Sequence, residues 1–115
     1  MDIQVRSRMV DNVAVVEVAG ELDIHTSPQL EAAIRVQLRR GRVRLLIDLS
    51  DTTYLDNTAL RILTQAARET RQSGGHLAVI YARPLVQKIF EITRLYEMIP
   101  VYPSAGAALD AARAW

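Results

Sequence analysis

One short apolar run, followed closely by a helical pattern, constrains the fold of this chain more than any other feature. The run is Leu45-Leu46-Ile47-Asp48-Leu49, and apolar residues then recur at helical spacing from Leu60 to Ala67. Such a nearly unbroken run predicts a strand buried on both faces, because a half-buried strand would alternate. Between the strand and the helix the chain is expected to turn, within residues 50–55. A buried strand leading into a helix is typical of α/β folds.

Three polar residues, Asp56, Asn57 and Thr58, stand directly before the helical pattern. The carboxylate of Asp56 is placed to accept hydrogen bonds from the free N–H groups of the first helical turn and to complement the helix dipole. The three side chains are therefore expected at a helix N-terminus just outside the sheet. Such a terminus can hold an anion or present hydroxyl groups to a partner. This segment is the first candidate functional site.

The rest of the chain alternates strand-like and helical patterns. Expected strands cover about residues 3–6, 13–19, 44–49, 77–81 and 99–102, and expected helices begin near Thr26, Thr58, Pro84 and Ser104. The turn residues Asp11 and Asn12 between the first two strands predict an antiparallel hairpin. Each later strand–helix–strand step should be a right-handed parallel crossover. The predicted fold is a single α/β domain over residues 1–115, with a mixed, mostly parallel sheet, an N-terminal β-hairpin and about four helices.

Hydroxyl side chains and glycines mark the expected helix ends. Thr26 or Ser27 is expected to cap the first helix, and Gly41 to end it. The pair Gly74-Gly75 is expected to end the second helix in the same way. Four apolar residues of the third helix are expected to face inward: Leu85, Val86, Ile89 and Phe90.

Composition argues against several classes of protein. With 14 basic and 13 acidic residues the net charge is +1, which gives no reason to expect nucleic acid as a partner. The absence of cysteine excludes disulfides and thiolate metal sites, and no metal site is expected. The N-terminus lacks the apolar core of a signal peptide, and no apolar run approaches the length that spans a membrane. We therefore expect a soluble, cytoplasmic protein.

Four carboxylates invite comparison with enzymes: Glu21, Asp23, Asp48 and Asp56. They would suffice for acid–base chemistry, but the sequence has no phosphate-binding Gly-rich motif, no Ser–His–Asp pattern and no metal-ligand spacing. The closest rival of this size is a response-regulator receiver, which would need an acceptor Asp beyond a central strand. Asp48 instead lies inside the expected strand. We expect neither an enzyme nor a bound cofactor.

Three sequence blocks together resemble the STAS family, specifically the bacterial anti-sigma-factor antagonists. The blocks are Gly20-Glu21-Leu22-Asp23, Leu46-Ile47-Asp48-Leu49-Ser50 and Tyr54-Leu55-Asp56-Asn57-Thr58-Ala59-Leu60. The resemblance extends over the whole chain. It implies a switch protein that binds an ATP-dependent serine-kinase anti-sigma factor, frees the sigma factor, and is turned off when that kinase phosphorylates it. A monomer or weak dimer is expected.

Two positions depart from the family motif, which is usually Asp-Ser-[Ser/Thr]-Gly-Leu with the phosphorylated Ser directly after the Asp. Asn57 occupies the position of the phosphoacceptor, and Ala59 that of the Gly. Asn has no hydroxyl group to phosphorylate, whereas Ala is favoured over Gly in a helix by roughly 1 kcal/mol. The fold is therefore expected to tolerate the changes, while the usual phosphorylation is lost. Thr58 is the substitute acceptor to consider, one helical step of about 100° away.

The resemblance implies a partner surface at the carboxyl ends of two strands. Asp23 follows one strand and the segment Asp56-Asn57-Thr58 follows the other, so we expect both on the same side of the domain. Asp23 has an alternative role at a strand end or in the helix start at Thr26. The missing Ser also favours a different class of function, namely a STAS scaffold or assembly module, or the cytosolic partner of a transporter.

Overall fold

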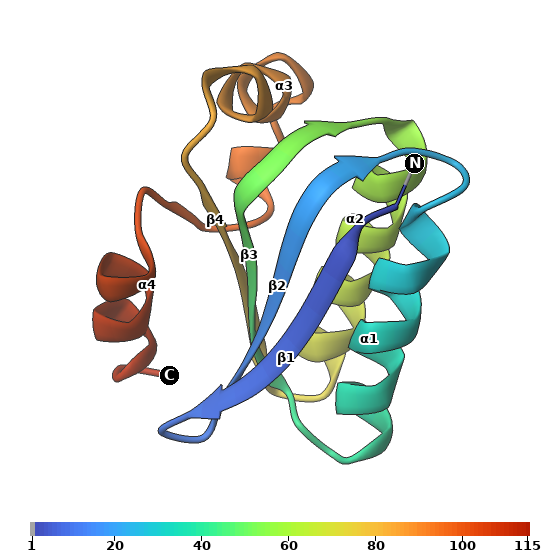
Figure 1. The fold of residues 1–115 in the computed structure, drawn as a ribbon. Coiled ribbons are helices and arrows are strands. Elements are labelled where there is room, and N and C mark those ends of the chain that lie inside the picture. Colours follow the sequence, from blue (N-terminus) through green and yellow to red (C-terminus); the bar gives the residue numbers. More distant parts are fainter. Residues whose placement is uncertain (1) are drawn as a thin grey trace.

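The computed structural model describes residues 2–115, which form a β-hairpin followed by alternating helices and strands, five strands and four α-helices in all (Figure 1). The strands are β1 (Gln4–Val10), β2 (Val13–Leu22), β3 (Arg44–Leu55), β4 (His76–Tyr81) and β5 (Val101–Tyr102). The helices are α1 (Ser27–Arg39), α2 (Asn57–Gln72), α3 (Pro84–Thr93) and α4 (Ala105–Ala112), with a short 3₁₀ turn at Leu95–Glu97. The strands form one sheet in the order β1-β2-β3-β4-β5, in which β1 runs antiparallel to β2 and the other pairs are parallel. The predicted α/β fold is confirmed.

The β1–β2 hairpin is closed by the two residues that were predicted to form its turn. Asp11 and Asn12 have φ values of 49° and 68°, the left-handed conformation that a tight two-residue hairpin turn requires. Asp and Asn tolerate this conformation better than most residues that carry a Cβ. Val10 therefore pairs with Val13 directly across the turn, which sets the register of the whole hairpin.

The helices cover the two faces of the sheet unequally. α1 and α2 lie side by side against one face, α4 lies on the other, and α3 lies at the end of the sheet where β4 finishes (Figure 1). A large core cluster lies under α1, α2 and α3, and a smaller one lies under α4. Arg35 of α1 and Glu69 of α2 form an ion pair that includes a 2.6 Å hydrogen bond. The hydrogen bonds from Arg35 lower the pKa of the Glu69 carboxyl below its usual value.

β3 is the central strand, and its apolar run is buried on both faces. Leu45, Ile47 and Leu49 belong to the large cluster beneath α1 and α2, whereas Leu46 belongs to the smaller cluster beneath α4. All four side chains are fully buried. The prediction of a strand buried on both faces is confirmed.

β3 also continues beyond its predicted end, so the prediction of a turn within residues 50–55 was wrong. The strand runs to Leu55 and stays paired with the last residues of β2, with register shifts that mark a β-bulge. Thr52 is fully buried, and its hydroxyl donates a 2.9 Å hydrogen bond to the carbonyl of Val18. The polar composition of this stretch resembles a turn, but β2 is long enough to hold it in the sheet.

Two predicted helix caps are confirmed, and at the third Thr26 occupies the N-cap position without making a capping hydrogen bond. Asp56 caps α2, and Ser104 caps α4 by accepting a 3.1 Å hydrogen bond from an N–H group of the first turn. Thr26 precedes α1, but its hydroxyl donates to the carbonyl of Glu21 at 2.7 Å instead of accepting from the helix. Ser27 is already the first residue of α1, and its side chain is buried. Neither predicted hydroxyl therefore caps α1.

Gly75, at the turn between α2 and β4, lies against the backbone of the loop before β3. A Cβ atom added there would lie 2.0 Å from the carbonyl oxygen of Val43. The N–H of Gly75 is also held by a 2.7 Å hydrogen bond to the carbonyl of Thr70, which restricts movement of the turn. We expect Gly75→Ala to destabilise the domain by about 1–3 kcal/mol or more. Thermal or chemical denaturation measures this change.

The matched control is the same substitution in a helix. At Gly106 in α4, the nearest atom to an added Cβ is the Oγ of Ser104, 3.9 Å away. Gly106→Ala should stabilise the domain by about 0.5–1 kcal/mol, because Ala loses less backbone freedom in a helix than Gly. Equal stabilities of the two variants would contradict the tight approach at Gly75.

Candidate functional site

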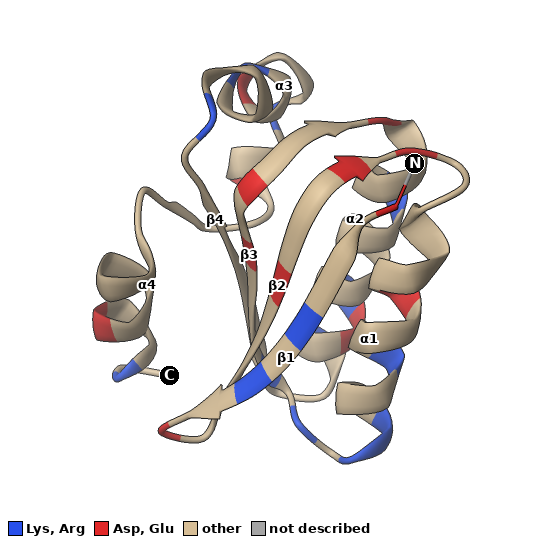
Figure 2. Cartoon of the chain, viewed as in Figure 1, with Lys and Arg blue, Asp and Glu red and all other residues tan. Residues whose placement is uncertain are grey.

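The segments that follow β2 and β3 meet at one end of the sheet, where several acidic residues lie (red in Figure 2). The N–H of Asp56 donates a 3.0 Å hydrogen bond to the carbonyl of Leu22, the last residue of β2. Asp23 comes directly after that residue. The structure therefore brings Asp23 and Asp56 to the same side of the domain, as predicted.

Asp56 forms the N-cap of α2, with an extended backbone. Its Oδ1 accepts hydrogen bonds from the N–H groups of Thr58, at 2.9 Å, and Ala59, at 3.3 Å. Two of the N–H groups that a helix start leaves free are therefore already bonded to a carboxylate. A bound anion would meet this negative charge. The geometry favours presentation of side chains to a partner over the binding of an anion.

Asn57 and Thr58 occupy the first two positions of α2 and differ in exposure. The side chain of Asn57 is exposed, whereas Thr58 is half-buried. Ala59, at the position of the motif glycine, is fully buried within the large core cluster. Asn57 is therefore the residue of this turn that α2 presents most openly to the surroundings.

Asp23 organises the connection between β2 and α1. Its Oδ1 accepts hydrogen bonds from the backbone N–H groups of Thr26, at 2.9 Å, and His25, at 2.8 Å. These bonds, chiefly the one from Thr26, hold the pKa of the Asp23 carboxyl below its usual value. The predicted role of Asp23 in the helix start is confirmed. Its neighbours Ile24 and His25 are exposed, so the same turn is also open to a partner.

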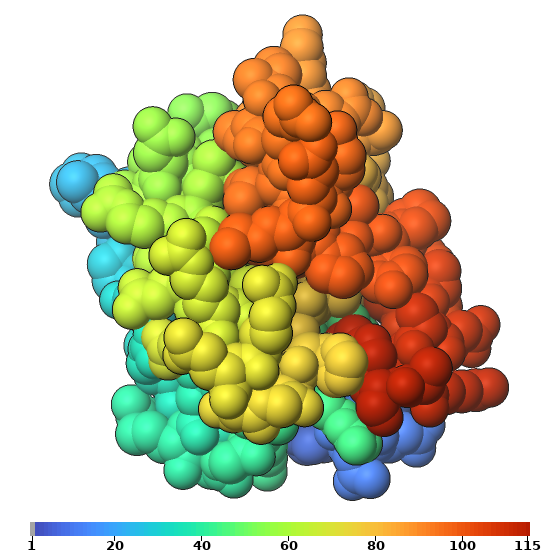
Figure 3. Space-filling view, turned by 180° about the vertical axis from the view of Figure 1, so that it is seen from behind, coloured from blue at the N-terminus to red at the C-terminus, as the bar shows by residue number. Residues whose placement is uncertain are grey.

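An apolar groove adjoins the start of α2, and the sequence did not predict it. It lies between the end of β3, the first turn of α2 and α3, and Asp56 and Asn57 line one part of it. Its apolar lining consists of Tyr54, Leu55, Leu60, Leu85, Ile89 and Ile92. In the space-filling view of Figure 3, the chain around α3 (orange) stands out beyond the rest of the molecule. The polar segment at the start of α2 therefore borders an apolar region.

The prediction that Leu85 faces inward was wrong. Val86 and Phe90 are fully buried, whereas Leu85 is 48% exposed and Ile92 is 70% exposed. Leu85, Ile89 and Ile92 form a second apolar stripe at helical spacing beside the buried one. α3 has more apolar residues than one buried face of a helix requires. This excess is the sequence signal that would have indicated the groove.

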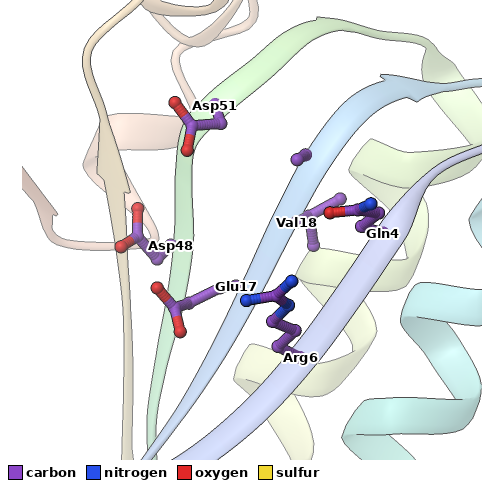
Figure 4. A pocket seen from close by; sticks show the side chains of 7 residues that line it. Gln4, Arg6, Glu17, Val18, Asp48 and Asp51 are labelled. Carbon is purple, nitrogen blue, oxygen red and sulfur yellow. The ribbon is translucent and has the colours of Figure 1, made fainter.

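The four carboxylates considered for catalysis are not all brought together. Asp48 lies on the open face of the sheet, where it lines a hollow with Arg6, Glu17 and Asp51 (Figure 4). Its Oδ1 accepts hydrogen bonds from the N–H and hydroxyl of Ser50, at 2.9 and 2.6 Å. Asp48 is thus tied to its own strand and lies apart from the segment at the start of α2.

The described part of the chain contains neither a metal site nor a membrane-spanning helix. No group of three or more His, Cys, Asp and Glu side chains there is placed to hold a metal ion. Its longest helix, α2, has 16 residues, fewer than the roughly 20 apolar residues that cross a bilayer. None of its helices has the length and apolar character that such a span requires.

Comparison with known proteins identifies the family. The model of the STAS domain family matches residues 4–108, which is nearly the whole chain. The chain belongs to the STAS family. The resemblance inferred from three sequence blocks is therefore confirmed.

This STAS domain is similar to anti-sigma factor antagonists in both sequence and structure. It is 30% identical over 101 residues to the anti-sigma-B factor antagonist of Listeria monocytogenes, with 88% of each chain covered. It is 27% identical over 113 residues to the anti-sigma F factor antagonist of Paenibacillus polymyxa, covering 95% of this chain and 94% of that one. The crystal structure of an anti-sigma factor antagonist from Mycobacterium paratuberculosis has a TM-score of 0.90 and 32% identity, covering 96% of this chain and 94% of that one.

Proposed function

We propose that this STAS domain is an anti-sigma factor antagonist, which binds an anti-sigma factor and thereby frees a sigma factor for transcription in the cytoplasm. The proposed partner surface consists of Asp23, Asp56, Asn57 and Thr58. The observation that carries the proposal is the junction of the β2 and β3 ends, which puts Asp23 on the same end as the exposed Asn57. The shared description of the relatives supports the same activity. This function requires binding and no catalysis by the domain itself.

The partner is an anti-sigma factor of the ATP-dependent serine-kinase type. Support for this partner comes from the segment Asp56-Asn57-Thr58-Ala59-Leu60, which aligns with the motif that such kinases phosphorylate. In the fold this segment begins α2, and Asn57 at the acceptor position is exposed, so that the active site of a kinase can reach it. Because Asn57 stands at the acceptor position, the kinase can bind this domain but cannot phosphorylate that residue.

Asn57→Arg is expected to weaken binding of the anti-sigma factor by about tenfold or more. The change places a long cation where the start of α2 presents a small neutral amide, and an unpaired charge is costly in a desolvated interface. The partner is first identified by pull-down from the native cell with mass spectrometry. Titration calorimetry with the purified partner then measures the affinity.

Asp23→Asn tests the other strand end without disturbing its turn. The amide keeps an oxygen that can accept from the N–H groups of Thr26 and His25, while the negative charge is removed. Gln72→Arg is the control for Asn57→Arg, because it adds the same charge to the exposed far end of α2. If neither Asn57→Arg nor Asp23→Asn alters the affinity while their melting temperatures match wild type, the interface lies elsewhere.

A second candidate function is a STAS scaffold or assembly module, or the partner of a transporter. The observation that favours it is Asn57, since this position lacks the hydroxyl group on which the usual switch depends. Purification from the native cell under non-denaturing conditions separates the two functions. An antagonist should appear in a small complex with a kinase-like protein, whereas a scaffold should appear in large assemblies.

A further inference from the structure

α3 carries two apolar stripes, and the core accounts for one of them. Val86 and Phe90 are fully buried in the large cluster. Leu85 and Ile92, on the second stripe, remain largely exposed, and Ile89 between them is only partly buried. Aliphatic side chains are stabilised by removal from water, so an exposed stripe at the edge of a groove is typical of an interaction site.

The groove beside this stripe is large enough to receive side chains of another molecule. Its volume is about 340 Å³. An apolar cavity of about 150 Å³ accommodates one benzene ring, so the groove has room for one or two large apolar side chains. Tyr54 supplies its wall on the β3 side and is itself 42% exposed.

We propose that the anti-sigma factor inserts an apolar segment into this groove. The inference rests on the proposed function, and it extends the partner surface from the start of α2 to Leu85 and Ile92 of α3. Within the described part of the chain, Asp56 is the only charged residue that lines the groove. The inserted segment therefore carries large apolar side chains, with a hydrogen-bond donor or a cation at the end that meets Asp56.

The groove is continuous with the polar surface proposed for the anti-sigma factor, and this continuity is the reason to assign the anti-sigma factor as its occupant. Asp56 and Asn57 line the groove and also belong to the surface proposed for the anti-sigma factor. A molecule seated on the start of α2 therefore covers part of the groove, and the groove supplies the apolar contact area that a polar helix start lacks. A second copy of this chain in the same place would cover Asn57 and compete with the anti-sigma factor, so self-association is one outcome of the test.

The test compares Leu85→Ser and Ile92→Ser with Met9→Ser in the full chain. Met9 lies on β1, is 43% exposed, and does not line the groove, so it is the matched control. Calorimetric titration with the purified anti-sigma factor should give about tenfold weaker affinity for each groove variant. Met9→Ser should bind like wild type, and Ile92→Leu, which keeps the apolar volume, should retain most of the affinity. Unchanged melting temperatures show that the variants fold.

Three outcomes overturn the inference and are distinguishable. If Asn57→Arg weakens binding while both groove variants bind like wild type, the groove is not part of the interface and the proposed function stands. If wild type binds no anti-sigma factor, the proposed function fails and this occupant fails with it. If wild type sediments as a dimer that Ile92→Ser converts to a monomer, with no change in affinity for the anti-sigma factor, the groove binds a second copy instead.

Discussion

Ile47→Ala is expected to lower the free energy of unfolding by about 2–5 kcal/mol. Ile47 lies in β3, which is paired with β2 on one side and β4 on the other, and its side chain is fully buried in the large core cluster. Truncation removes buried methyl groups and leaves a cavity that neighbours held in a sheet fill only in part. Because small domains are stable by only about 5–15 kcal/mol, this loss is a large share of the total. Denaturant titration followed by circular dichroism measures it.

Leu46→Ala tests the opposite face of the same strand. Leu46 is fully buried in the smaller cluster under α4. Its truncation should lower the free energy of unfolding by a similar amount. Arg39→Ala and Gln72→Ala are the controls, since both side chains are exposed and such changes typically stay within about 0.5 kcal/mol. A cost near zero at Leu46, with a full cost at Ile47, would mean that α4 does not cover its face of the sheet in solution.

The parts of the fold that were predictable from the sequence depend on neighbouring residues. The run from Leu45 to Leu49 is apolar at nearly every position, which only a strand covered on both faces explains. Asp11 and Asn12 are themselves the residues that adopt the left-handed turn conformation. Asp56 caps a helix whose first N–H groups are two and three residues away. In each case the deciding interaction lies within a few positions.

The parts that were not predictable depend on how the strand ends lie in the assembled sheet. Thr52 stays in β3 and bonds to Val18, 34 residues earlier, so a locally turn-like stretch remains a strand. The hydroxyl of Thr26 could accept a hydrogen bond from the first turn of α1 or donate one to the end of β2. It donates to the carbonyl of Glu21 in β2. The extended conformation at Thr52 and the hydrogen bond of Thr26 therefore depend on where each residue lies in the assembled sheet, and residue type alone does not predict them.

The candidate site likewise has one half that the sequence predicted and one half that it did not. Its polar half, Asp56 and Asn57, is contiguous in the sequence and was predicted from a motif. Its apolar half combines Tyr54 from β3 with Leu85 and Ile92 from α3. Those residues form one surface only because α3 lies at the end of the sheet. A single apolar stripe was sufficient to predict α3 as a helix, but Leu85 was wrongly assigned to the core, and the exposed Ile92 was not singled out.

Wild-type protein is expected to gain no phosphate when incubated with its cognate kinase and ATP. A serine kinase needs a hydroxyl group at the attacking position, and the amide nitrogen of Asn57 is a poor nucleophile because its lone pair is delocalised. Thr58 does carry a hydroxyl, but it is half-buried and follows Asn57 by one helical step of about 100°, which turns it away from the exposed position. Intact-mass spectrometry before and after incubation measures the outcome.

Asn57→Ser is expected to restore phosphorylation and with it the off state. The new phosphate carries about −1.5 to −2 charges. It would stand beside the carboxylate of Asp56 and on the lining of an apolar groove, so like-charge repulsion and desolvation should weaken binding of the anti-sigma factor by about tenfold or more. Unmodified Asn57→Ser should bind like wild type, because Asn is neutral and polar as Ser is. A phosphate on wild type that disappears in Thr58→Ala would contradict the predicted loss of phosphorylation and make Thr58 the switch.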